Sequence, residues 1–195
     1  IIDATAINIT QKNETYFDTL EGLAAIPYFR DENNSLADKT EWLNEVGASS
    51  KLFKNMIFVD KSGNAMDDNG NVIDDSKSTY FMASRTGKRG ILDPSNYNGQ
   101  LSMIYSVPVY GYDKYVCGVI AGIVEGDALT KVVENLSVGN GNSPFLINMS
   151  TGIVVADVNF ANVERQANVV KNTTGEMQLK LQDAAKGSRN ATEVF

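Results

Sequence analysis

The period of the hydrophobic pattern changes once along this chain, and that change constrains the fold more than any single motif. At the start, an apolar stripe repeats at intervals of seven residues: Ile2, Ile9, Tyr16 and Leu23. This spacing predicts one long helix over the first ~30 residues, which Pro27 ends or kinks. A second helix is predicted after Ser35, because Asp38 stands three positions later as in a capping box.

Beyond the second helix the pattern becomes that of short strands separated by turns. A strand is predicted at Met56–Asp60, followed by turns at Ser62-Gly63 and Asn69-Gly70. A short helix over Ser78–Thr86 is expected to stop at Gly87. The apolar runs at 90–94, 101–110 and 115–124 predict three strands of an antiparallel meander. A further helix is predicted at Asp127–Leu136.

A faint internal repeat follows. The segment "SPFLINMSTGIVVADVN" mirrors "KNMIFVDKSGNAMDDN": each is an apolar strand, an Asn or Asp, a Ser/Thr-Gly turn and a second strand. The repeat predicts two similar modules. The second has room for two strands, a helix at about 175–186 and the start of a strand at 191–195. We therefore expect the chain to be a fragment that ends inside its second module.

Charge and residue usage exclude several classes of function. The formal net charge is −7, which disfavours nucleic acid and anionic membrane surfaces as partners. Histidine is absent, so histidine triads, histidine zinc sites and imidazole pH switches are excluded. Cys117 is the single cysteine, so no intrachain disulfide can form, and its apolar strand predicts a small buried residue.

Metal and catalytic motifs were sought and not found. The acidic segment "DDNGNVIDD" fails as an EF-hand loop when counted from Asp67 or from Asp60, since neither count puts Gly sixth and Glu twelfth. It predicts a solvated hairpin turn instead. No nucleophile elbow, phosphate loop or dinucleotide fingerprint occurs, and no two carboxylates are placed to face each other across a cleft. The sequence thus predicts no enzyme, no metal and no cofactor.

The helix predicted at 78–86 carries the one group of residues that suits a ligand. Tyr80 and Phe81 offer large rigid rings, and Arg85 offers a planar fork for a carboxylate or phosphate. Beside a sheet, such residues can line a small-molecule pocket. The alternative is that Tyr80 and Phe81 only pack the helix on the sheet while Arg85 is solvated. From these residues alone both interpretations stay open.

The order of the segments resembles the extracellular double Cache domain of bacterial receptors. The resemblance rests on short motifs in the family's order: Tyr80-Phe81, Ala83, Gly87, Asp93-Pro94, Pro108-Val109 and Gly118-Val119. The segment "FLINMSTGIVVADVN" is similar to the opening of the family's membrane-proximal lobe. The resemblance covers nearly the whole chain, and its specificity lies in the order and spacing of the motifs.

The resemblance implies an α+β fold with a long N-terminal helix, a PAS-like antiparallel-sheet lobe and a second, incomplete PAS-like lobe. The expected domains are a helical stalk with the second helix (1–55), a membrane-distal lobe (56–138) and a truncated membrane-proximal lobe (139–195). It also implies a place on the extracytoplasmic face of a bacterial cell membrane, in a membrane-anchored parent protein. The start at Ile1 and the lack of a membrane-spanning apolar run agree with a fragment of such a receptor.

The resemblance further implies that the distal lobe binds a small molecule and that no cofactor takes part. The candidate ligand-binding residues are Tyr80, Phe81, Arg85, Asp93, Tyr97 and Tyr105. Core packing remains the alternative for Tyr105. One subset of the family grips free amino acids with an Arg before the aromatic pair and an Asp on the last strand. This chain has Ser78 and Ile123 there, so a free amino acid held in that manner is not expected.

Two hypotheses follow from different classes of function. The first is a ligand-sensing domain of a chemotaxis methyl-acceptor, a sensor histidine kinase or a diguanylate cyclase, with a homodimer seam along Ile2, Ile9 and Tyr16. The fragment itself is then no enzyme, although its parent can carry an enzymatic output domain. The second is a structural or protein-interaction module on the cell surface that has no small-molecule ligand. Solid packing beside Tyr80 would favour the second hypothesis.

Overall fold

The computed structural model describes residues 2–67, 69–134, 144–172, 174–175 and 178–179. The chain divides into two compact units. We call Lys12–Leu92 with Ser102–Glu125 the sheet unit, and Ile1–Gln11 with Asp93–Leu101 and Gly126–Phe195 the hairpin unit. The domain boundaries expected at residues 56 and 139 stay a prediction. No helix among the described residues has the length and apolar character needed to cross a bilayer.

A four-stranded sheet in the order β1-β6-β5-β4 is the framework of the sheet unit. Its strands are β1 (Asn55–Asp60), β4 (Gly90–Tyr97), β5 (Gln100–Tyr110) and β6 (Val116–Glu125). β5 and β6 pair antiparallel with Tyr105 opposite Gly122, and β6 pairs antiparallel with β1 with Phe58 opposite Ile120. The predicted order of the meander strands is confirmed, and β1 joins the sheet beside β6.

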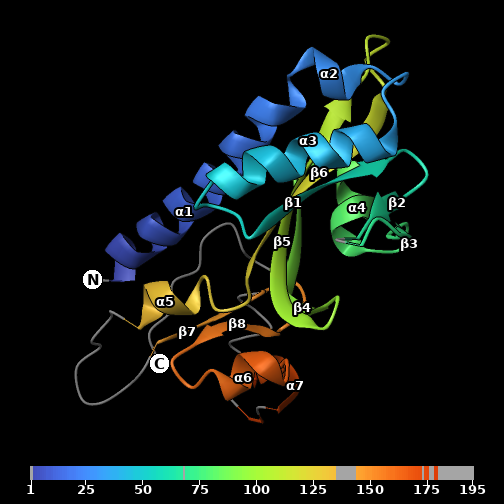
Figure 1. Ribbon diagram of the computed structural model, residues 1–195. Helices are drawn as coiled ribbons and strands as arrows, with labels where there is room; N and C mark the ends of the chain where they lie inside the picture. The colour runs from blue at the N-terminus through green and yellow to red at the C-terminus, as the bar shows by residue number, and fades with distance from the viewer. Residues whose placement is uncertain (1, 68, 135–143, 173, 176–177, 180–195) are drawn as a thin grey trace. The chain divides into compact units, whose positions relative to one another are not determined.

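Helices cover both faces of this sheet (Figure 1). Alternate residues of a strand point to opposite faces, so Tyr105 and Ser106 on β5 separate the two layers. Tyr105 meets the aromatic rings of α1 (Ile2–Ala24), while Ser106 meets Ser84 of α4 (Thr79–Ser84). α3 (Leu36–Ser49) lies on the same side as α1, where Gly47 approaches Met56 of β1.

The short strands of the sheet unit form a separate hairpin next to α4 (Figure 1). β2 (Asn64–Met66) pairs antiparallel with β3 (Val72–Asp74) across the turn predicted at Asn69-Gly70. Asp60 and Asp67 each accept backbone N–H bonds from residues two and four positions later. These two aspartates therefore shape turns, in agreement with the solvated hairpin that the sequence predicted in place of a calcium loop.

The predicted helix boundaries reflect local chemistry. α1 ends at Ala24, and Pro27 then stands in the first turn of a short helix, α2 (Pro27–Arg30), where its missing N–H costs nothing. Ser35 caps α3: its hydroxyl oxygen accepts the N–H of Asp38 at 3.1 Å. The helix start predicted from the pattern "SLAD" is confirmed.

Tyr16 corrects one part of the predicted dimer seam. Its ring is 4% exposed and packs 4.5 Å from the ring of Tyr105 and 5.4 Å from that of Phe53, centroid to centroid. Tyr16 is therefore a core residue of its own chain and has no exposed ring to offer a partner. The side chain of Ile2 lies outside the described residues, and the seam at Ile9 stays a prediction.

The hairpin unit is built on β7 (Phe145–Ile147) paired antiparallel with β8 (Val154–Asp157). Three short helices accompany it: α5 (Thr130–Val133), α6 (Ala161–Glu164) and α7 (Val169–Asn172). α5 occupies part of the helix predicted at Asp127–Leu136, whose last two residues lie outside the described ones. The strand predicted at 191–195 and most of the helix predicted at 175–186 also lie outside them.

Candidate functional site

Tyr80 and Phe81 are both fully buried between α4 and the sheet, with no exposed surface. The hydroxyl of Tyr80 donates to Oδ2 of Asp75 at 2.5 Å, and the hydroxyl of Ser78 donates to Oδ1 of the same carboxylate at 3.2 Å. Asp75 is itself buried. The carboxylate thus anchors the start of α4 by charge-assisted hydrogen bonds, a role that the sequence interpretation missed.

A buried pair of serines holds the other side of α4 on the sheet. The hydroxyl oxygens of Ser84 and Ser106 are 2.8 Å apart, and that of Ser106 also donates to the carbonyl oxygen of Tyr80 at 3.0 Å. Gly90 makes this close approach possible, since a Cβ there would lie 2.4 Å from Oγ of Ser106. The first residue of β4 is therefore a glycine, because any side chain there would also meet the carbonyl oxygen of Tyr80, at 2.5 Å from a Cβ.

Arg85 is exposed at the C-terminal end of α4. Its guanidinium lies 5.8 Å from the centroid of the Phe81 ring. It therefore lies over the ring of Phe81, while the hydroxyl of Tyr80 is bonded to Asp75. This position suits a solvated cation and leaves the guanidinium accessible from outside.

Tyr105 lies on the opposite face of the sheet from the aromatic pair. Its hydroxyl donates to Oδ1 of Asn13 at 2.6 Å, and its ring packs against Tyr16 and Phe17 of α1. The alternation of β5 explains this, because Ser106 takes the face that α4 covers. The structure does not bring Tyr105 together with Tyr80 and Phe81.

Asp93 and Tyr97, the remaining candidates, belong to the hairpin unit. Oδ2 of Asp93 accepts a hydrogen bond from Nδ2 of Asn148 at 2.7 Å. Burial raises the pKa of the Asp93 carboxyl above its ordinary value, partly offset by hydrogen bonds from Asn148 and Thr151. Within its unit, Asp93 thus ties the middle of β4 to the β7–β8 turn.

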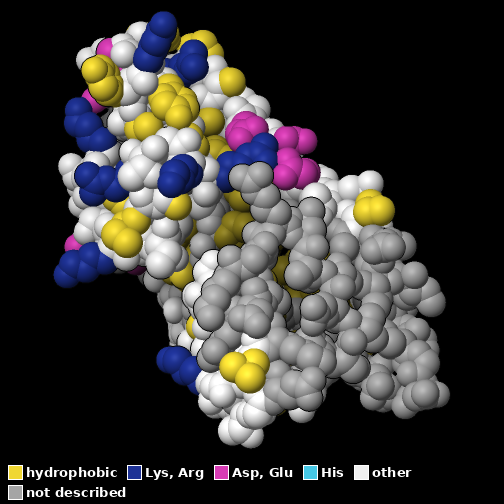
Figure 2. Space-filling view, turned by 180° about the vertical axis from the view of Figure 1, so that it is seen from behind, with side chains coloured by type: hydrophobic (Ala, Val, Ile, Leu, Met, Phe, Trp, Pro, Cys, Tyr) yellow, Lys and Arg dark blue, Asp and Glu magenta, His cyan; other side chains and the backbone are white. Residues whose placement is uncertain are grey.

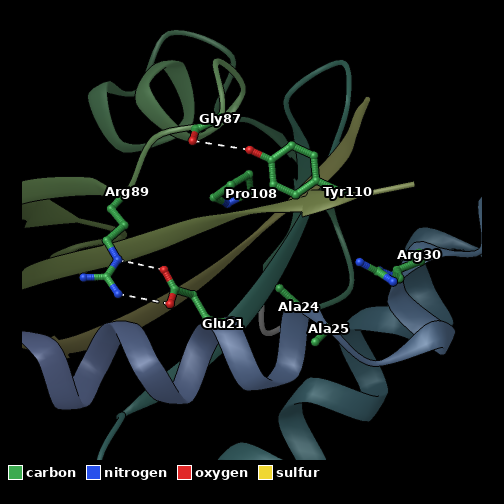
Figure 3. A pocket seen from close by; sticks show the side chains of 8 residues that line it. All are labelled: Glu21, Ala24, Ala25, Arg30, Gly87, Arg89, Pro108 and Tyr110. Carbon is green, nitrogen blue, oxygen red and sulfur yellow. Dashed lines mark hydrogen bonds and ion pairs between the residues drawn. The ribbon is translucent and has the colours of Figure 1, made fainter. Parts of the chain in front are cut away.

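A pocket of about 350 Å³ opens in the sheet unit where α1 ends (Figure 3). It is lined by Glu21, Ala24, Ala25, Arg30, Gly87, Arg89, Pro108 and Tyr110. β5 forms one wall: it runs on to Tyr110, whereas β4 begins at Gly90 close to Ser106. Pro108 and Tyr110 near the end of β5 line this space together with Ala24 and Ala25 (Figure 3). The pocket size is in the range of small-molecule sites.

One end of the pocket carries a guanidinium that is already held by carboxylates. Arg89 donates to both carboxylate oxygens of Glu21, at 2.7 and 3.0 Å, and to Glu14 at 2.7 Å. Its guanidinium also lies 4.8 Å from the centroid of the Phe17 ring. The hydrogen bond from Arg89 is the main reason why the pKa of Glu21 lies below its ordinary value near 4.5. On the face of the molecule that Figure 2 shows, acidic side chains lie next to basic ones at one place.

The other end of the pocket carries Arg30, which extends from α2 toward Ala24 (Figure 3). Its Nε is buried and has no hydrogen-bond partner among the described residues. No hydrogen bond or ion pair engages the rest of this guanidinium within the described part of the chain. The two arginines of the pocket thus differ: Arg89 is saturated by carboxylates, and Arg30 is not.

Sequence interpretation missed this pocket. The acidic stripe of α1 was the available signal, since Glu14, Asp18 and Glu21 share one helix face and require a basic partner. Nothing in the sequence indicated that Arg89, sixty-eight residues from Glu21, would be that partner. Among the described residues, no group of three or more Asp, Glu or Cys side chains is arranged to hold a metal ion.

No protein-family model matches the sequence, and no curated protein matches it. Solved structures do match. The ligand-binding domain of the Pseudomonas fluorescens chemoreceptor CtaA, in complex with L-serine, is 15% identical, with a TM-score of 0.67 over 87% of this chain and 73% of that one. The ligand-binding domain of the Pseudomonas aeruginosa amino acid chemoreceptor PctC, in complex with GABA, is 19% identical, with a TM-score of 0.65 over 87% and 77%.

The chain is also similar to the extracellular domain of a protein described as a histidine kinase. Here the identity is 16% and the TM-score is 0.69, over 87% of this chain and 73% of that one. At such identities the likeness establishes the fold. The chain therefore has the fold of the extracellular sensor domains of bacterial chemoreceptors and histidine kinases, and the expected α+β class is confirmed.

Proposed function

We propose that this chain is the extracytoplasmic ligand-sensing domain of a bacterial membrane receptor and that its sheet unit binds a small molecule. The observation that carries the proposal is the fold shared with two chemoreceptor domains that were solved with small ligands, L-serine and GABA. The fragment has no catalytic role in this proposal. Its parent is a chemotaxis methyl-acceptor, a sensor histidine kinase or a diguanylate cyclase.

The proposed ligand contacts are on the α4 side of the sheet, at Tyr80, Phe81 and Arg85. Because the two rings are fully buried, a ligand there has to displace packing, so binding and a change of conformation go together. Asp93 and Tyr97 belong to the hairpin unit and stay predictions from the sequence, while Tyr105 faces α1 instead. The residues that grip free amino acids in the family's pattern are absent at Ser78 and Ile123, so we propose a different class of ligand.

A second candidate function is a surface interaction module without a small-molecule ligand. The complete burial of Tyr80 and Phe81, together with the hydrogen bond from Tyr80 to Asp75, favours it. In that case the aromatic pair serves only to hold α4 on the sheet. The two candidates differ in whether any small molecule stabilises the folded chain.

A thermal-shift screen over small metabolites separates them, because a ligand that binds only the folded state raises Tm. A hit is then measured by calorimetry against Tyr80→Phe, which keeps the ring, with Tyr112→Phe on the exposed β5–β6 turn as the matched control. We expect weaker binding by Tyr80→Phe alone. A screen without hits favours the interaction module. A hit that binds Tyr80→Phe as tightly as the wild-type chain would show that its site is not at α4.

A further inference from the structure

The pocket at the end of α1 contains one arginine, Arg30, whose guanidinium pairs with no carboxylate in the described part of the chain. Ala24, Ala25 and Pro108 form an apolar middle section between its two charged ends. At one end, Arg89 and Glu21 satisfy each other. At the other end stands Arg30, half-buried, with an unpartnered Nε. The pocket therefore needs one negative charge, and only at the Arg30 end.

The state of Arg30 points to an anion. A buried donor without a partner costs about 1–3 kcal/mol, and an arginine keeps its charge at any ordinary pH. The nearest carboxylates along the chain do not fill the need: Asp31 accepts from Asn33, and Glu32 pairs with Lys61 at 2.6 Å. A planar carboxylate matches the guanidinium fork and would satisfy Nε directly.

The rest of the lining limits what the anion can carry. An ammonium group would need a free carboxylate, and the only carboxylate in the lining, Glu21, is occupied by both Arg89 nitrogens. A second anionic group would need a free cation, and Arg89 is saturated by Glu14 and Glu21. The alanines and Pro108 instead suit a short apolar body.

From these contacts we infer a second binding site, whose lining does not include the buried Tyr80 and Phe81, that takes a small organic monocarboxylate with a short apolar body. Its carboxylate pairs with the guanidinium of Arg30, and its body lies along Ala24, Ala25 and Pro108. The lining joins the end of α1 and Arg30 of α2 to the segment that follows α4, so occupancy of the site bears on the end of α1. It stands on the geometry of the sheet unit and does not depend on a ligand at Tyr80.

Butyrate is the probe, and butyramide, which has the same shape without the charge, is its control. Binding to the 195-residue chain is followed by amide chemical-shift changes in NMR titrations. We expect butyrate to saturate with a Kd of about 1 mM or tighter, with shifts at Ala24, Ala25 and Tyr110, and butyramide to bind at least ~10-fold more weakly.

Arg30→Gln removes the charge and is expected to weaken butyrate binding ~10-fold or more, because a charge-assisted hydrogen bond is lost. Arg30→Lys keeps the charge but lacks the planar guanidinium. Its affinity for butyrate should lie between those of the wild-type chain and Arg30→Gln. Lys88→Gln removes an exposed charge beside the pocket that is outside its lining, and controls for general electrostatic attraction. Urea unfolding of each variant shows that it is folded.

Three results overturn this inference: no butyrate binding, equal binding of butyramide, or equal losses in Arg30→Gln and Lys88→Gln. None of them touches the proposed sensing function, which the metabolite screen and Tyr80→Phe test separately. Conversely, a screen in which all hits depend on Arg30 and none on Tyr80 supports this site and contradicts the proposed α4 contacts.

Discussion

Arg89 shows how a single residue joins two distant parts of the sheet unit. It precedes β4, covers the ring of Phe17 and forms ion pairs with Glu14, Asp18 and Glu21 along α1. These groups are all about one-third exposed or more, so water screens them and each pair stabilises only weakly. The geometry nevertheless fixes the end of α1 against the start of β4, which is where the pocket opens.

Arg89→Gln is expected to raise the pKa of Glu21 toward its ordinary value, since the hydrogen bond from Arg89 is the largest cause of the lowering. A carboxyl with a lowered folded pKa stabilises the fold above its unfolded pKa, near 4.5, and loses this contribution as pH falls through the folded value. The stability gap between wild type and variant, about 0.5–1 kcal/mol at neutral pH, should therefore close in acid.

Side-chain NMR titration of Glu21 measures the pKa, and urea unfolding at neutral and acid pH measures the gap. Lys131→Gln is the control, because Lys131 pairs with Asp127 in the other unit. An unchanged Glu21 pKa in Arg89→Gln, or a gap that widens in acid, would show that Arg89 does not hold this carboxylate in solution.

At the scale of elements, short-range hydrogen bonds and glycines determine the conformation of the turns. The internal repeat seen in the sequence has a structural counterpart: Asp60, the last residue of β1, and Asn148, which follows β7, each accept the N–H of a serine two residues later. A glycine with positive φ follows in both turns, Gly63 and Gly152. The two segments differ in pairing, because β7 pairs with β8 while β1 pairs with β6.

Gly63 and Gly70 form a matched test of this turn chemistry. Both have positive φ, of 95° and 80°, so alanine at either is strained by about 1–2 kcal/mol. At Gly63 the new Cβ would also lie 2.5 Å from Cα of Ser76, while at Gly70 nothing lies within 4 Å. We expect Gly63→Ala to lose ~1–3 kcal/mol more stability than Gly70→Ala. Urea unfolding compares them, and equal losses would mean that Ser76 yields without cost.

At the scale of the whole molecule, the two units differ in how much of their backbone is shielded. β5 and β6 have long runs of buried residues, whereas β7 has an exposed residue followed by two half-buried ones. Amide exchange in a protein follows local opening, which requires less free energy where fewer apolar contacts must break. The sheet unit and the hairpin unit can therefore unfold locally in separate events.

Hydrogen–deuterium exchange is therefore expected to be slowest in the paired residues of β5 and β6 and faster in β7. The measurement is peptide-resolved exchange of the free chain at neutral pH. Strands β1 and β6 serve as an internal comparison, since they pair over their full common length within the sheet unit. Equal protection of β7 and β5 would indicate that the chain opens as one cooperative body.

The sequence by itself determined the local elements of this protein. These elements depend on interactions between residues a few positions apart: the helical spacing, the Ser35 cap, the turn glycines and the apolar strand runs. Such local interactions can be inferred from neighbouring residues alone. Tertiary structure alone decided the rest. Tyr105 became a core residue because β5 turns it toward α1, ninety-two residues from its partner Asn13. Arg89 pairs with Glu14 and Glu21, and Arg30 meets no carboxylate in the described part of the chain, because packing, which no local pattern encodes, sets which charges meet.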